Sequence, residues 1–237
     1  MFILYNLASI DTYIREFLLS LCLDIEHTSK TMLMTDITYN NQEDGYHIVD
    51  LFKQKCPQKY NSIYDHYKVN TYLKDMFIKT YGSPLPIWAL LELVDFGAFT
   101  MILDLYIKEY SIRKSKVNNL SKNLRYVRNA CAHNNVFLLN VYNYKSNYIK
   151  RPTHLSKQIA SKSGVQEINR FYNKPHDVLI LFWIHKTICS NALNVRRHHD
   201  GLKVIERIKK SEENYKNSDS LLRFFSLLNK MIDLLHA

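Results

Sequence analysis

Hydrophobic side chains recur at helical spacing from the first residues of the chain. Intervals of four and three residues place them on one face of a helix, because a helix turns by about 100° per residue. Asp11 and Arg15, four residues apart, can pair on the other side. The pattern predicts a first helix over residues 3–33, with these positions on its apolar face: Ile3, Leu7, Ile10, Ile14, Phe17, Leu21 and Ile25.

Later segments show the same period. They predict helices over residues 118–133 and 176–194, and another in the C-terminal segment "SLLRFFSLLNKMIDLLH". The basic segment "GLKVIERIKKSEEN" before it is also predicted to be helical. Between the first two of these helices, residues 140–175 are richer in Tyr, Asn, Ser and Lys. We interpret them as a long, partly irregular connection with one short helix.

The segment "SPLPIWALLELVDFGAFTMILDLYIKEY" has a clear start signal. Ser83 can cap a helix, and a proline in the first turn is compatible with helical backbone. Trp88 and Phe96 are predicted to lie in the core. Gly97 costs about 1 kcal/mol against alanine inside a helix. It therefore either lets another backbone approach closely or separates two helices.

Composition supports an all-helical fold. Glycine and proline number only five each among 237 residues, whereas all-β proteins need more of both for their turns. Hydrophobic residues make up 46% of the chain, which is enough to bury a sizeable core. We therefore predict an all-α bundle that forms a single domain over residues 1–237.

The formal net charge of +10 suits a polyanionic partner such as RNA, DNA or an acidic protein. The charge is spread along the chain, and one candidate basic surface lies in and after "NVRRHHD". There, contact with an RNA backbone and a solvated basic helix end are both compatible with the sequence. The candidate RNA-binding residues are Arg196, Arg197, Lys203 and Arg207.

The remaining composition predicts no cofactor, metal site or disulfide. The four cysteines show no CxxC spacing, so we expect buried reduced thiols. No apolar run reaches the ~18 residues of a membrane span. The N-terminal "MFILYNLASID" lacks a basic leader and reaches Asp11 too early for a signal peptide. These features predict a cytoplasmic protein.

The stretch "LRYVRNACAHNN" carries the candidate chemistry. Asn129 and His133 are four residues apart and share one stripe of a helix, separated by ~6 Å along its axis. Arg128 lies about 100° round the helix from Asn129, and its long side chain can lean toward the same stripe. Asn134 and Asn135 predict the end of the helix, since asparagine tolerates the left-handed cap.

These residue types suit cleavage of RNA without a metal. A histidine can accept or donate the proton near neutral pH, and an arginine binds phosphate through two parallel hydrogen bonds. Asn129 can orient a side chain or contact the sugar. One histidine supplies only one of the two proton transfers, so a two-fold homodimer is expected to supply the second. From spacing alone, a helix cap with surface polarity is the alternative interpretation.

Three ordered blocks resemble those of Abi-like (abortive infection) proteins. The first, in "LYNLASIDTYIREFLLSLCLDIEHTSK", contains Asp11, Arg15, Ile25, Glu26 and Lys30. The second, in "PLPIWALLELVDFGAFTMI", contains Pro86, Trp88, Glu92, Phe96 and Gly97. The third is "LRYVRNACAHNN". Lys30 stands where arginine is common in the family, and Asn134, Asn135 and Val136 replace the usual His-Asn-Arg.

The resemblance implies membership of the HEPN superfamily. It therefore implies an all-α bundle, frequent dimerisation and an R-x4–6-H motif that is a metal-independent ribonuclease site in many members. Carried over by position, Arg128 and His133 are the catalytic pair, Asn129 is the polar residue after the arginine, and Glu92 is a possible support for a motif group.

Such proteins often act as toxins or phage-defence effectors on RNA, restrained by a cognate antitoxin protein or a regulatory RNA. Two alternatives remain open. One is a non-catalytic RNA- or protein-binding module on the same fold. The other is a DNA-binding regulator that uses the basic C-terminal helices.

Overall fold

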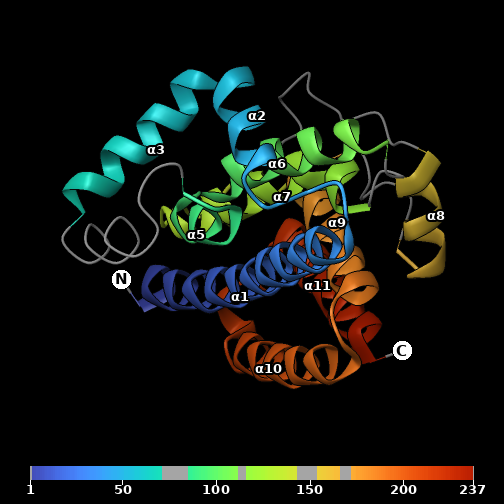
Figure 1. Cartoon of the computed structure of the whole chain (residues 1–237). Helices are drawn as coiled ribbons and strands as arrows, with labels where there is room; N and C mark the ends of the chain where they lie inside the picture. The colour runs from blue at the N-terminus through green and yellow to red at the C-terminus, as the bar shows by residue number, and fades with distance from the viewer. Residues whose placement is uncertain (1, 71–84, 112–115, 143–153, 166–171, 237) are drawn as a thin grey trace. The chain divides into compact units, whose positions relative to one another are not determined.

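The computed structural model of the chain describes residues 2–70, 85–111, 116–142, 154–165 and 172–236, and within these ranges it contains helices and no strand (Figure 1). The prediction of an all-α fold is confirmed. The α-helices are α1 (Phe2–Tyr39), α2 (His47–Lys55), α3 (Pro57–Val69), α5 (Ile87–Leu93), α6 (Phe96–Glu109), α7 (Lys116–Ala132), α8 (His154–Lys162), α9 (Asn173–Ile188), α10 (Asn191–Lys210) and α11 (Asp219–His236).

The helices group into two compact units. Unit 1 comprises Met1–Ile25 and Lys122–Ala237, and unit 2 comprises Glu26–Ser121. The division therefore falls inside α1 and inside α7. The prediction of one domain over residues 1–237 stays a prediction, and each unit is considered separately below.

Unit 1 is built on α9, which is apolar on all sides. Its residues from Val178 to Phe182 are almost fully buried, and α8, α10 and α11 all contact it. A helix that is hydrophobic all round needs partners all round, so this segment is a core helix. The apolar face predicted for α1 also packs in unit 1: Phe17 meets Phe182 with ring centroids 6.0 Å apart.

The predicted helix over 176–194 is wrong at its C-terminal end. The structure ends α9 at Ile188 and begins α10 at Asn191. Ser190 has extended backbone, and its hydroxyl oxygen accepts a hydrogen bond from the Leu193 backbone N–H at 3.3 Å. Serine is a favoured N-cap residue, so a helix start at Ser190 outweighs the continuous apolar pattern.

A glycine brings α10 close to its neighbours in unit 1. A Cβ atom added at Gly201 would lie 2.7 Å from Ile232 of α11 and 2.9 Å from Phe17 of α1. Only a residue without a side chain fits this spacing. The tight contact keeps α10 packed against α11 along the basic segment that the sequence analysis singled out.

Unit 2 contains α2, α3, α5 and α6. The helical segment predicted there forms two helices, α5 and α6, separated at Val94 and Asp95. The Asp95 carboxylate caps α6 by accepting from the Ala98 N–H at 2.7 Å. Of the two uses proposed for Gly97, the structure places it beside a helix break. Phe96 is buried as predicted.

The prediction that Trp88 lies in the core is wrong. Its neighbours Ile87 and Ala89 take the buried side of α5, and Trp88 is 40% exposed. The indole covers Gly45, where an added Cβ would lie 2.8 Å from the ring. Gly45 also has a positive φ of 81°, a conformation that favours glycine.

A buried charge network joins α1, α9 and α10 in unit 1. The imidazole of His185 is fully buried and bonds to Asp24 at 3.1 Å and to Asn194 at 2.9 Å, while Arg197 donates to the same Asp24 carboxylate. Burial alone would lower the pKa of His185. The contacts with Asp24 and Cys189 outweigh burial and raise the pKa from 6.5 to about 9. Burial raises the pKa of Asp24, and its bonds to Arg197 and His185 lower it, to about 2.

The raised pKa of His185 predicts a pH-dependent stability. Its contribution is complete below the unfolded-state pKa of 6.5 and is lost as the pH rises toward about 9. Urea unfolding of wild type and His185→Gln should therefore differ most below pH 6.5. Between pH 6.5 and 9 the difference should shrink by up to about 1.4 kcal/mol per pH unit.

The exposed His27 offers a matched control for this measurement. His27→Gln removes an imidazole from the surface of α1 and should retain the wild-type pH dependence. An equal slope for His185→Gln and wild type would contradict a charged His185 in the folded state.

Candidate functional site

The motif helix α7 ends in a well-defined cap in unit 1. Asn134 has a positive φ of 55°, and its N–H donates to the Cys131 carbonyl at 3.2 Å. The Asn135 N–H donates to the Ala130 carbonyl at 3.0 Å. These two bonds define a Schellman motif, with His133 as the residue that closes the helix. The predicted helix end at Asn134 is confirmed.

The last three turns of α7 have one buried and one exposed face. Leu124, Val127 and Cys131 point into the core of unit 1. The exposed side chains form a continuous stripe, which we call the α7 stripe: Lys122, Arg125, Tyr126, Asn129 and His133. Two of the three predicted catalytic residues therefore face solvent together.

Arg128 lies at the edge between the two faces. Its Nη1 atom is 3.4 Å from the Oδ1 atom of Asn129, so the guanidinium leans toward the α7 stripe. Its Nε atom is buried and has no hydrogen-bond partner among the residues that the structure describes. No carboxylate of the described residues pairs with Arg128, so a ligand with acceptor oxygens at this edge would meet guanidinium donors.

The chain after the cap is held by a buried carboxylate. One oxygen of Asp11 accepts hydrogen bonds from the backbone N–H groups of Phe137 and Leu138, both at 2.7 Å. Its other oxygen accepts from Arg15 Nε at 2.7 Å, and Arg15 Nη1 donates to Asn134 Oδ1 at 2.6 Å. The predicted Asp11–Arg15 pair is confirmed, and it binds the cap of the motif helix.

A lysine holds the same segment from α9. Lys174 Nζ donates to the carbonyl oxygens of Phe137 and Leu139, at 2.8 and 2.6 Å. Burial lowers the pKa of Lys174, and Asp11 and Cys131 oppose that shift. Sequence reasoning missed Lys174, since nothing in its local pattern distinguishes it from other lysines.

Cys131 lies beneath the cap and is chemically inert. Burial raises the pKa of its thiol to about 12, so the nucleophilic thiolate is not populated near neutral pH. The thiol therefore serves as a packing group.

The other predicted site residues lie elsewhere on the chain. Glu92 is an exposed residue of α5 in unit 2, whereas the motif belongs to unit 1. Arg196 and Lys203 are exposed on α10, and the Arg207 guanidinium stacks on the Tyr13 ring at 4.0 Å. Arg197 instead donates to Asp24 and Asp200, so its guanidinium is engaged by carboxylates of unit 1.

Tyr142 is the described member of the tyrosine-rich stretch 142–148, and the rest of that stretch lies outside the described residues. Its ring packs against Tyr172 with centroids 5.0 Å apart and carries the Arg223 guanidinium at 4.2 Å. Tyr142 is buried and therefore packs within unit 1.

In the part of the chain that the structure describes, no three His, Cys, Asp or Glu side chains are grouped so as to hold a metal ion. None of its helices combines the length and the apolar character needed to cross a membrane.

Fold and site together define an all-α protein in which exposed Asn129 and His133, with half-buried Arg128 beside them, lie at a capped helix end. The family model for Abi-like proteins matches residues 3–143, more than half of the chain. The chain therefore belongs to the Abi-like protein family, a name that refers to abortive infection, a form of resistance to phage. No curated protein and no solved structure matches the chain significantly.

The bonds to Asp11 predict a large loss of stability in Asp11→Ala. Removing the carboxylate leaves two backbone N–H groups and Arg15 without their acceptor, which costs about 3 kcal/mol. Urea unfolding measures the loss. Glu16→Ala removes an exposed carboxylate from the same helix and should change stability by less than about 0.5 kcal/mol. Similar losses in both variants would contradict the assignment.

Proposed function

We propose that the chain is a metal-independent endoribonuclease of the HEPN type that acts as an abortive-infection or toxin-type effector against phage. The observation that carries the proposal is the placement of His133 and Asn129 on the exposed α7 stripe, with the guanidinium of Arg128 leaning toward them. Membership of the Abi-like family supports the role in phage defence.

The chemistry follows from these groups. A base removes the proton from a ribose 2′-OH, whose oxygen attacks the adjacent phosphorus and displaces the 5′-oxygen. An acid protonates that leaving oxygen, so the products are a 2′,3′-cyclic phosphate and a 5′-hydroxyl. His133 acts in one of these proton transfers. Arg128 binds the phosphoryl oxygens and stabilises the charge that develops on them.

A homodimer completes the site. His133 lies about 140° round the helix from Arg128, and one chain offers a single motif imidazole. Two copies related by a two-fold axis bring two imidazoles and two guanidinium groups to one cleft. The basic surface of α10, with Arg196, Lys203 and Arg207, extends the contact with the RNA backbone. Glu92 is a candidate support, and a cognate antitoxin or regulatory RNA is the expected restraint.

A non-catalytic RNA- or protein-binding module is the second candidate. The buried Nε atom of Arg128 favours it, since a partly buried arginine also serves to hold a helix end. Both candidates require the same fold, and only a measurement of catalysis separates them.

Incubation of the purified protein with RNA in EDTA tests the proposal. Wild type should cleave, and mass spectrometry should find a cyclic phosphate at the new 3′ ends. His133→Ala and Arg128→Ala should each lose activity by about a hundredfold or more, since each removes a group that acts in the transition state. Arg128→Lys keeps the charge but not the two parallel hydrogen bonds. Its cleavage activity should lie between that of the alanine variants and that of wild type.

The exposed His27 again serves as the control position. His27→Ala should cleave at the wild-type rate, because this residue lies outside the motif. If RNA survives equally with wild type, His133→Ala and Arg128→Ala, the endoribonuclease proposal is wrong and the binding module stands.

A further inference from the structure

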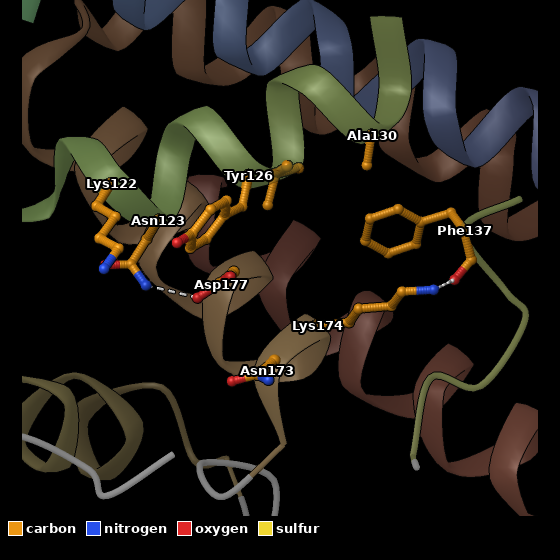
Figure 2. Close-up of a pocket in the computed structure, with 9 residues that line it drawn as sticks. Lys122, Asn123, Tyr126, Ala130, Phe137, Asn173, Lys174 and Asp177 are labelled. Carbon is orange, nitrogen blue, oxygen red and sulfur yellow. Dashed lines mark hydrogen bonds between the residues drawn. The ribbon is translucent and has the colours of Figure 1, made fainter. Parts of the chain in front are cut away.

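A cavity of about 530 Å³ opens between α7 and α9 in unit 1 (Figure 2). Tyr126 and Ala130 point into it from α7, Phe137 forms one side, and Asn173 and Asp177 lie on α9. Its volume is within the range of small-molecule sites, roughly 300–1,000 Å³. None of the predicted catalytic residues lines it, so it is a distinct site.

The polar lining of this cavity combines one carboxylate, that of Asp177, with the amides and ammonium groups of four neighbours: Asn123, Asn173, Lys122 and Lys174. Asp177 is 5% exposed, and its Oδ1 atom accepts from the Nδ2 atom of Asn123 at 2.6 Å. This bond turns the amide so that its nitrogen faces Asp177 (Figure 2). His176 is also buried and contacts the same carboxyl oxygen at 3.2 Å. The carboxyl group is therefore held in place before any ligand arrives.

Aromatic surface covers the other side. The ring of Tyr126 is 49% exposed, and Lys122 lies over it with its ammonium 6.0 Å from the ring centroid. Phe137 is buried, and Asp11 and Lys174 hold its backbone in place. An exposed aromatic ring beside a lysine is a stacking platform for a base whose phosphate lies at the entrance.

The cavity and the motif share one face of α7. Tyr126 and His133 both belong to the α7 stripe and are seven residues apart, about 10 Å along the helix axis. A strand of RNA whose backbone passes His133 can therefore place a neighbouring base at Tyr126.

We propose that this cavity binds one nucleobase of single-stranded RNA and prefers a base with an exocyclic amino group, namely adenine, cytosine or guanine. Such an amino group can donate to the Asp177 carboxylate. Uracil has no exocyclic amino group, and its single N3–H donor is flanked by two carbonyl oxygens that the negative charge of Asp177 disfavours. This inference rests on the proposed function in one respect: it takes RNA as the substrate.

Binding of nucleoside 5′-monophosphates to the full chain tests the cavity directly. Isothermal titration in EDTA should show AMP, CMP or GMP binding at least about fivefold more tightly than UMP. Tyr126→Ala should weaken that binding by about tenfold, since stacking is worth this much per base. Tyr126→Phe keeps the ring and should bind like wild type, as should Tyr5→Ala, which removes another exposed tyrosine of unit 1.

Asp177→Asn provides a second, nearly isosteric test. It places an amide donor in the wall and should reduce or reverse the preference against UMP. Binding of UMP as tight as that of the other three in wild type, or equal binding by Tyr126→Ala and wild type, would overturn the proposal whether or not Asp177→Asn folds.

Two further measurements show whether the bound base belongs to RNA or to a free nucleotide, and separate the cavity proposal from the endoribonuclease proposal. A short RNA with one adenine in a uracil background should displace AMP at a lower concentration than AMP itself, whereas a free nucleotide that outcompetes RNA would refute an RNA site. His133→Ala should bind AMP like wild type. If AMP binding depends on Tyr126 but no RNA is cleaved, only the endoribonuclease proposal is wrong. If RNA is cleaved but AMP binding does not depend on Tyr126, only the cavity proposal is wrong.

Discussion

The bonds from Asp11 to the backbone of Phe137 and Leu138 are the constraint on which the site depends. A single carboxyl oxygen satisfies two N–H groups directly after the α7 cap, 126 and 127 residues away in the chain. Arg15 carries the connection to Asn134, and Lys174 satisfies the carbonyl groups of the same segment. Since both the donors and the acceptors of this turn are held, the position of His133 is fixed by backbone bonds rather than by its own contacts.

This arrangement explains why the motif remains open while its support is buried. Asp11 is 3% exposed and Cys131 also 3%, yet His133, two residues after Cys131, faces solvent. A helix end that is fixed from beneath can present polar groups without covering them. The network of Asp24, His185 and Arg197 plays a comparable part further along unit 1, where it joins α1 to α9 and α10 through paired charges. Buried charges of this kind are tolerated because each has its partner.

Local signals were sufficient for much of the fold. Helical periodicity predicted α1, α7 and α11, and Asn134 marked the end of the motif helix because its side chain tolerates a positive φ. Periodicity alone failed at Ser190, where a cap residue divides an apolar run. It also failed at Trp88, whose hydrophobicity says nothing about which face of a short helix it occupies. The roles of Asp11 and Lys174 depend on contacts between distant segments, which no local pattern contains.

The geometry of α7 also limits what one chain can do alone. Arg128 and His133 differ by about 140° in direction, so a phosphate bound by the guanidinium of a single chain does not automatically meet its own imidazole. The side chain of Arg128 removes part of this separation by leaning toward Asn129, at 3.4 Å. The rest is removed more readily by a second copy than by unwinding the helix, because the Schellman bonds and the Asp11 carboxylate oppose any change in the cap. The rigid cap set by these hydrogen bonds is therefore the physical argument for the two-chain site that we propose.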